Sequence, residues 1–294
     1  MNKPDTSKLS FIISMVIFGT IGIFVHYIPL SSGIIAFIRG FTGAACLLIF
    51  ALVSKTEISL KNIKSNLLLL CISGAAIGFN WILLFEAYRH TTVSTATLCY
   101  YMSPVFVMLV SPFVFGERLT VKKICCVIAS LIGMVCISGI AEGNIPKPYE
   151  LTGILLALGA AILYASVIIM NKKFKEISAH NKTFIQLAVA AAVVLPYTLL
   201  AESFSVVDFT PICVILLLTV GIVHTGIAYL LYFGAVKNIP AQTVAILSYI
   251  DPALAIILSA IILSEPMSLV ASLGAILILG STLISEITLN KKSR

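Results

Sequence analysis

Ten apolar runs, each close to the length that crosses a bilayer, follow one another along this sequence. An α-helix needs about 20 residues to cross ~30 Å of hydrocarbon. The sequence therefore predicts an all-α membrane protein with ten transmembrane helices. We expect these spans at approximately 9–27, 33–53, 66–88, 93–115, 121–140, 151–170, 183–201, 212–235, 241–263 and 268–287.

The second half of the sequence repeats the first at a constant offset. A shift of 148 residues superposes Tyr-Met-Ser-Pro, which ends at Pro104, on Tyr-Ile-Asp-Pro, which ends at Pro252. The same shift superposes Glu117 on Glu265, and it pairs identical residues at five further positions. A single offset over such a stretch indicates an internal duplication.

The duplication predicts one membrane domain, 1–294, built from repeats at about 9–140 and about 151–287. Each repeat holds five of the predicted spans, and five is an odd number. The two five-helix repeats must therefore be inverted relative to each other in the membrane. Inverted repeats place a substrate site near the membrane midplane, at the interface between the repeats.

The distribution of charge predicts the orientation. The chain is 60% hydrophobic and 11% charged, whereas soluble domains are about 25% charged. Its net charge of +7 is compatible with an anionic partner such as nucleic acid. However, sixteen Lys and Arg residues fall in segments that the predicted spans place on one side of the membrane, and only Arg89 and Lys147 fall on the other. This pattern marks the cytoplasmic side of a membrane protein. We predict a multi-pass protein of the cell membrane with both termini cytoplasmic and no nucleic-acid partner.

Two prolines occupy equivalent places in the two repeats. Pro104 and Pro252 fall at the midpoints of the spans 93–115 and 241–263. Each proline removes a backbone hydrogen bond and tends to kink or break its helix. We expect both helix breaks to lie beside a central cavity lined by the first, third, fourth, sixth, eighth and ninth spans.

Polar and aromatic side chains at mid-depth are the candidate substrate-binding residues. Ionisable groups inside the membrane are costly, and they almost always face a cavity or another polar group. The predicted set is Asn80, Trp81, Tyr101, Tyr164, His224, Tyr229, Tyr249 and Asp251.

Each of these residues has a structural alternative. A buried Tyr or Trp can be a packing residue with a satisfied hydrogen bond. His224 can simply form a hydrogen bond between helices. Asp251 can cap the half-helix that starts at Pro252. If Asp251 is functional instead, we expect it to handle protons or a cationic substrate.

Arg39 and Glu86 are candidate gate residues. Arg39 lies inside its span near the outer face, so it can snorkel, pair with a carboxylate, serve an outer gate or contact an anionic substrate. Glu86 lies near the outer end of the third span beside Arg89 and His90, which also suits a residue that is only interfacial.

The sequence offers nothing typical of an enzyme site. It contains no phosphate loop, catalytic triad or nucleotide fingerprint. Its seven cysteines lie inside apolar runs without a CxxC pair, which favours packing over disulfides or metal ligation. We therefore predict no enzymatic activity, no cofactor and no metal site.

The paired segments MSPVFVMLVSPFVFGERLT and IDPALAIILSAIILSEPMS resemble the EamA family of the drug/metabolite transporter superfamily. In both, a mid-span proline precedes a Glu at the end of the span, and the resemblance covers essentially the whole chain. It implies a secondary transporter, commonly an exporter of amino acids, metabolites or toxic compounds. A carboxylate before the second-repeat proline, here Asp251, fits the family, whereas the first-repeat match is Ser103. Arg39 looks like the arginine often seen in the second helix of such repeats.

The favoured function is export of a small amphipathic or cationic metabolite, such as an amino acid, an amine or a toxic compound, by alternating access. Aromatic walls suit organic cations and aromatic solutes alike. Import of a nutrient amine is the competing transport hypothesis, and a lipid scramblase or partner subunit is the alternative of another class. The expected partners are a small-molecule substrate and the lipid bilayer, with protons as a candidate coupling ion and a homodimer as a candidate assembly.

Overall fold

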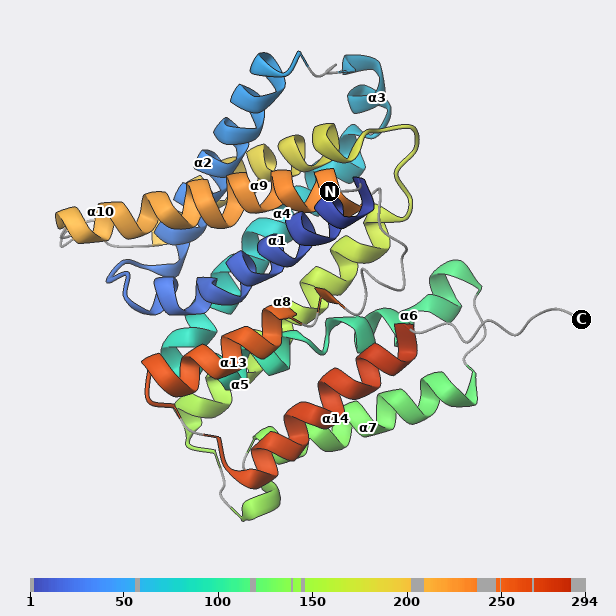
Figure 1. Ribbon diagram of the computed structural model, residues 1–294, viewed down its shortest axis with the longest axis vertical. Coiled ribbons are helices and arrows are strands. Elements are labelled where there is room, and N and C mark those ends of the chain that lie inside the picture. Colours follow the sequence, from blue (N-terminus) through green and yellow to red (C-terminus); the bar gives the residue numbers. More distant parts are fainter. Residues whose placement is uncertain are drawn as a thin grey trace, which may run out of the picture.

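A computed structural model describes the chain over residues 3–55, 59–116, 120–138, 140–143, 146–201, 209–236, 247–248, 250–265 and 267–286. Within these ranges the regular structure is helical and contains no strand (Figure 1). The α-helices are α1 (Lys3–His26), α2 (Ser32–Val53), α3 (Leu60–Ser65), α4 (Leu67–His90), α5 (Val93–Tyr100), α6 (Ser103–Phe115), α7 (Val121–Ile137), α8 (Pro148–Asn171), α9 (Ala179–Ala201), α10 (Pro211–Leu218), α11 (Ala228–Val236), α13 (Ile250–Ile262) and α14 (Leu269–Glu286). A short 3-10 helix, η1 (Ile140–Glu142), follows α7, and a π-helix, η3 (Thr219–Ile227), connects α10 to α11.

Among the described residues, seven helical segments are long and apolar enough to cross a membrane. They are Thr6–His26, Ser32–Val53, Leu67–His90, Val93–Val110, Pro148–Asn171, Ala179–Leu200 and Pro211–Tyr232. Two shorter apolar helices, Ile250–Ile262 and Leu269–Ser281, accompany them. The predicted all-helical membrane fold is confirmed at this level, while the count of ten spans stays a prediction.

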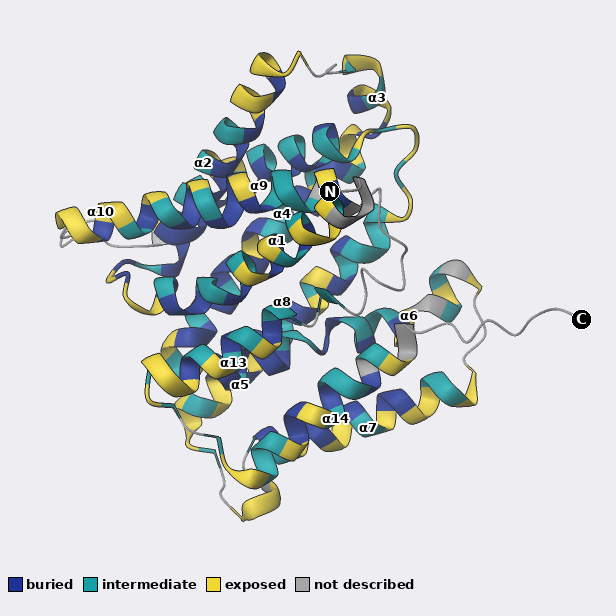
Figure 2. Ribbon diagram, in the orientation of Figure 1, coloured by how far each residue is buried: buried dark blue, intermediate teal, exposed yellow. Residues whose placement is uncertain are grey.

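Buried and exposed residues are distributed as in a helix bundle that faces lipid. Buried residues lie where the helices face one another, and exposed residues lie on the outward faces and at the ends (Figure 2). Large apolar side chains such as Phe113, Leu200 and Leu269 are among the exposed ones. So large an exposed apolar surface is uncommon in a soluble monomer and suits a membrane environment.

Helix contacts recur at the offset found in the sequence. The 148-residue shift carries α1 to α8, α2 to α9 and α7 to α14. In the structure α1 packs against α13 as α8 packs against α6, and α2 packs against η3 as α9 packs against α4. Corresponding helices of the two halves therefore have corresponding neighbours.

Glycines allow the closest helix pairs to approach. α7 and α14 lie together at the bottom of the view in Figure 1, and Gly133 and Gly274 face each other between them. A Cβ added to Gly274 would stand 2.6 Å from the carbonyl oxygen of Gly133. Because the neighbour is backbone, a larger side chain here would force the helices apart.

The predicted spans that carry the mid-span prolines are built from shorter helices. α5 ends at Tyr100 and α6 begins at Ser103, so Pro104 opens a second helix. Pro is well tolerated in a first turn, where its missing N–H leaves no hydrogen bond unmade. Pro252 likewise lies in the first turn of α13, which begins at Ile250.

The predicted span 212–235 contains a π-helix that the sequence did not indicate. Gly221 and Gly226 of η3 face the side chains of Thr42 and Cys46 on α2 at very short range. This contact brings η3 close to α2 and turns Thr225 toward it. π-helical turns often occur at functional sites.

Candidate functional site

The bundle contains a cavity of about 480 Å³. This volume falls in the range of roughly 300–1,000 Å³ that is typical of small-molecule sites. The lining extends beyond the spans expected from the sequence, because α2 contributes Arg39 and α9 contributes Lys182 and Gln186.

Most of the residues predicted from the sequence meet at this cavity. The predicted substrate-binding residues that border it are Asn80, Trp81, Tyr101, Tyr164, Tyr229 and Asp251. Arg39 and Pro104 border it as well, whereas Glu86, His224 and Pro252 are not among the lining residues. Tyr249 and Glu117 lie outside the described residues.

Arg39 brings a buried positive charge to the cavity. Its side chain is 6% exposed, and its Nε donates a hydrogen bond of 2.9 Å to Thr225 Oγ1 on η3. The guanidinium lies over the ring of Trp81, 4.4 Å from the ring centroid, with Phe85 at 5.7 Å. Cation–π contacts of this kind stabilise a desolvated arginine and fix the plane of its guanidinium.

Asp251 brings a negative charge to the same cavity. One carboxylate oxygen accepts a hydrogen bond of 2.7 Å from the hydroxyl of Tyr101. The backbone of Asp251 packs against α1, where a Cβ on Gly19 would stand 2.7 Å from the Asp251 carbonyl oxygen. The carboxylate is thus positioned by a side chain of the first half of the chain and by a glycine contact with α1.

Aromatic rings form much of the remaining wall. Tyr100 lies 5.3 Å from Tyr164 and 6.2 Å from Tyr101, measured between ring centroids. On another side, Phe18 of α1 lies 5.4 Å from Tyr229 of α11. These separations are those of interacting aromatic pairs. The rings present apolar faces and phenolic hydroxyls that together suit an amphipathic solute.

Asn80 joins two helices at the cavity wall. Its Nδ2 donates a hydrogen bond of 2.5 Å to the carbonyl oxygen of Ala160 on α8, and the residue is only 1% exposed. Asn80 therefore links α4 to α8 as well as bordering the cavity.

Polar residues outside the predicted substrate-binding set line the cavity near the connection between α8 and α9. Gln186 Nε2 donates to Ser73 Oγ at 2.8 Å and to Asn171 Oδ1 at 3.0 Å. Lys182 lies beside them, with its ammonium 5.7 Å from the ring of Phe174. Gln186 occupies about the place of Arg39 in the second repeat, whereas Lys182 was indicated only by its position at the end of an apolar run, which also suits an ordinary membrane-boundary residue.

The sequence model of the EamA-like transporter family matches this chain twice, over residues 6–139 and 151–286. The chain belongs to the EamA-like transporter family. It is therefore a multi-pass membrane protein of a transporter family rather than of an enzyme family.

Relatives of this EamA-like transporter cover most of its length. "Uncharacterized transporter YxxF" of Bacillus subtilis (strain 168) is 29% identical over 94% of this chain and 88% of the relative. "Aromatic amino acid exporter YddG" of Ancylobacter novellus is 26% identical over 63% of each chain. A solved crystal structure covers 96% of both chains with a TM-score of 0.66 and 18% identity, a likeness that shows the fold alone.

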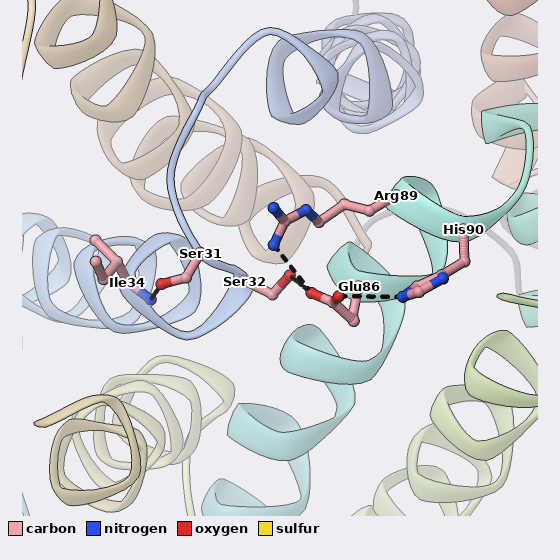
Figure 3. Close-up of polar contacts among 6 residues, drawn as sticks. All are labelled: Ser31, Ser32, Ile34, Glu86, Arg89 and His90. Atoms are coloured by element: carbon pink, nitrogen blue, oxygen red, sulfur yellow. Dashed lines mark hydrogen bonds and ion pairs between the residues drawn. The ribbon is translucent and has the colours of Figure 1, made fainter. Parts of the chain in front are cut away.

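Glu86 of the transporter lies in a separate polar cluster near the end of α4, shown in Figure 3. Its carboxylate accepts a hydrogen bond of 2.6 Å from Ser32 Oγ, at the start of α2. Arg89 and His90 approach the same carboxylate at 3.4 and 3.3 Å. Ser32 and Arg89 border a second cavity of about 410 Å³. Tyr88 borders both cavities and so belongs to the wall between them.

Glu265 forms a further connection between the halves of the chain. Its Oε2 accepts a hydrogen bond of 2.9 Å from the backbone N–H of Val93, the first residue of α5, and another from Ser259 Oγ. A carboxylate at a helix N-terminus satisfies a backbone donor that lacks an intrahelical partner. This contact links α5 to the segment that follows α13.

His224 of the transporter connects α1 to η3. Its Nε2 lies 2.9 Å from Thr20 Oγ1, and its Nδ1 lies 3.3 Å from the carbonyl oxygen of Thr219. The ring of Phe24 packs on it at 4.7 Å, and the histidine is 2% exposed. Its described contacts are those of a hydrogen-bonded residue between helices, and it is not among the residues that line the cavity.

Proposed function

We propose that this EamA-like transporter exports a small amphipathic organic solute that carries an amine, and that it does so by alternating access. The observation that carries the proposal is the central cavity, where the Asp251 carboxylate stands among tyrosine rings in a membrane protein. A carboxylate attracts an ammonium group, and aromatic faces accept both cations and apolar groups. One relative is named as an exporter of aromatic amino acids, which are solutes of this kind.

The shape of the cavity supports alternating access. The lining runs from Gly22 and Tyr88 toward Asn171 and Lys182, next to the basic connection that the charge pattern places in the cytoplasm. At the opposite end Tyr88 separates the cavity from the second one. We propose that this conformation is closed toward the outside and open toward the cytoplasm.

The two halves of the chain have the contacts that an alternating mechanism needs. α1 packs on α13 and α8 packs on α6, so each half places its first helix on the last part of the other half's broken span. In inverted repeats, opposite openings can form when one half rocks against the other around a fixed site. The Val93–Glu265 contact joins the two halves and would hold the outer side closed in the proposed orientation.

The test is solute flux in proteoliposomes with and without an imposed pH gradient. Wild-type protein should move L-tryptophan or tryptamine, and Asp251→Asn should abolish the flux or its response to pH while retaining an acceptor for the Tyr101 hydroxyl. Glu150→Gln is the matched control, because it removes a carboxylate that caps α8 at an exposed site away from the cavity. Wild-type rates and an unaltered pH profile in Asp251→Asn would make Asp251 a helix cap and overturn the proposal.

Direction needs a separate measurement. Cells that express the protein and are preloaded with labelled solute should lose the label faster than cells that express Asp251→Asn. Faster accumulation from the medium, with no change in efflux, would favour import of a nutrient amine over export.

A further inference from the structure

The guanidinium of Arg39 is buried at the cavity, and only part of its hydrogen-bonding capacity is satisfied by neighbouring residues. Its Nε is bonded to Thr225, and one of its faces is covered by Trp81. The two terminal nitrogens have no hydrogen-bond partner among the described residues, although the residue is 94% buried, its exposed fraction being 6%. A buried arginine with unpaired terminal nitrogens costs free energy unless another group accepts hydrogen bonds from them. The reason is that buried charges normally require both an opposite charge and hydrogen bonds.

The local structure holds this unused edge in a defined orientation. Thr225 accepts from Arg39 and donates its own hydroxyl to the carbonyl oxygen of Val220 at 3.1 Å, a bond that depends on the π-helical geometry of η3. Trp81 fixes the plane of the guanidinium from the side. With one face and the Nε edge occupied, the fork of the two terminal nitrogens remains for a ligand at the cavity. Such a fork matches a carboxylate with two parallel hydrogen bonds.

Asp251 does not neutralise Arg39 directly. Both residues border the cavity and interact electrostatically, yet no ion pair within 4 Å joins them in the described part of the chain. Asp251 is instead held by Tyr101. Arg39 and Asp251 are thus held apart at one cavity, each by other residues. This arrangement is complementary to a solute that carries one positive and one negative charge.

The charge balance of the lining points the same way. The charged residues among the described lining are Arg39, Lys182 and Asp251, so cations outnumber carboxylates by two to one. A purely cationic solute would add a third positive charge in a region of low dielectric, where like charges repel strongly. A solute that brings its own carboxylate avoids this repulsion.

We propose that Arg39 is the subsite for a carboxylate of the transported solute, so that the solute is a zwitterionic amino acid with an apolar or aromatic side chain rather than a simple amine. The ammonium lies toward Asp251, and the side chain lies against the tyrosine rings. This inference rests on the proposed function and narrows it, because a simple amine would satisfy the proposed function without Arg39.

Three probes of similar shape distinguish recognition of the carboxylate from recognition of the ammonium group. L-Tryptophan carries both groups, tryptamine lacks the carboxylate, and indole-3-propionate lacks the amine. Binding of each to purified protein in detergent is measured by calorimetry for wild type, Arg39→Gln, Arg39→Lys and Lys147→Gln. Lys147→Gln is the matched control, since it removes an exposed cation that does not border the cavity.

Wild type should bind L-tryptophan more tightly than tryptamine or indole-3-propionate, each of which carries only one of the two charged groups. Arg39→Gln should weaken L-tryptophan and indole-3-propionate about tenfold or more, the effect of losing a charge-assisted pair, while leaving tryptamine nearly unchanged or tighter. Arg39→Lys should recover part of the loss, because it restores the charge without the fork. Lys147→Gln should leave all three affinities unchanged, because Lys147 is exposed and does not border the cavity.

A structural role for Arg39 predicts a different pattern. If the arginine only holds η3 against α4, Arg39→Gln weakens all three probes together, and this outcome would overturn the subsite while leaving the proposed function intact. Equal affinity of wild type for tryptamine and L-tryptophan would also overturn it. If wild type bound none of the probes, both the subsite and the proposed function would be rejected. Should Arg39→Gln fail to fold, Thr225→Val removes the Nε acceptor and should weaken the two carboxylate probes selectively.

Discussion

Replacing Gly19 by Ala tests whether the close approach of α1 to α13 positions Asp251. A Cβ at Gly19 would stand 2.7 Å from the carbonyl oxygen of Asp251 and 3.1 Å from the Cβ of Leu254. Ordinary contacts begin near 3.4 Å, so the helices must separate by about 0.7 Å, the difference between 3.4 and 2.7 Å. The nearest atom belongs to the backbone, so no side-chain rotation relieves the contact.

Two opposing effects set the size of the change. Forcing an extra methyl group into a close-packed contact lowers the free energy of unfolding by about 1–3 kcal/mol. Ala in place of Gly within a helix restores up to about 1 kcal/mol. Gly280→Ala in α14 isolates the second effect, because a Cβ there would meet no atom within 4 Å. We therefore expect Gly19→Ala to be less stable than Gly280→Ala by about 1–3 kcal/mol.

The assay compares thermal unfolding of the two variants in the same detergent, followed by binding of tryptamine. Since the Asp251 carbonyl and side chain move together, Gly19→Ala should also weaken tryptamine, and Gly280→Ala should not. If the two glycine variants unfold at the same temperature and bind tryptamine equally, the contact between α1 and α13 does not position Asp251, and the reasoning fails.

Three further outcomes are expected. His224→Gln should cost about 1 kcal/mol of stability and leave solute binding unchanged, since the described contacts of His224 are interhelical; loss of the pH response of flux would return it to a proton-handling role. Glu86→Ala should cost about 1–3 kcal/mol by leaving the buried Ser32 hydroxyl without its acceptor, whereas Glu86→Gln should cost little; equal stability of the two variants would contradict this. Cysteines placed at Lys147 and Ser264, in a background without native thiols, should react with an impermeant reagent from outside, and labelling of Ser264 only from the cytoplasm would refute the inverted arrangement.

Depth in the membrane was readable from the sequence. An apolar run of membrane length indicates where a span lies, and a polar residue at its middle must reach a cavity or another polar group. Asn80, Trp81 and Asp251 were selected in this way, and all three border the central cavity. The offset of 148 residues between Pro104 and Pro252 likewise predicted two equivalent helix breaks.

The sequence did not predict in the same way the direction in which a side chain faces. His224 has the right depth, but it turns toward Thr20 and Phe24 of α1. Arg39 was compatible with snorkelling, pairing, gating or an anionic contact, and only the structure shows Trp81 beneath it and its two terminal nitrogens without a described partner.

The physical reason is that hydropathy along the chain determines depth, while packing determines rotation. Each residue turns a helix by about 100°, so a helix can keep its depth and still aim any one side chain at lipid, a neighbour or the cavity. In this protein the rotation of η3 follows from a π-helical turn and from Gly221 and Gly226 packing against α2. Such contacts between segments far apart in the sequence decide which buried polar groups share one cavity.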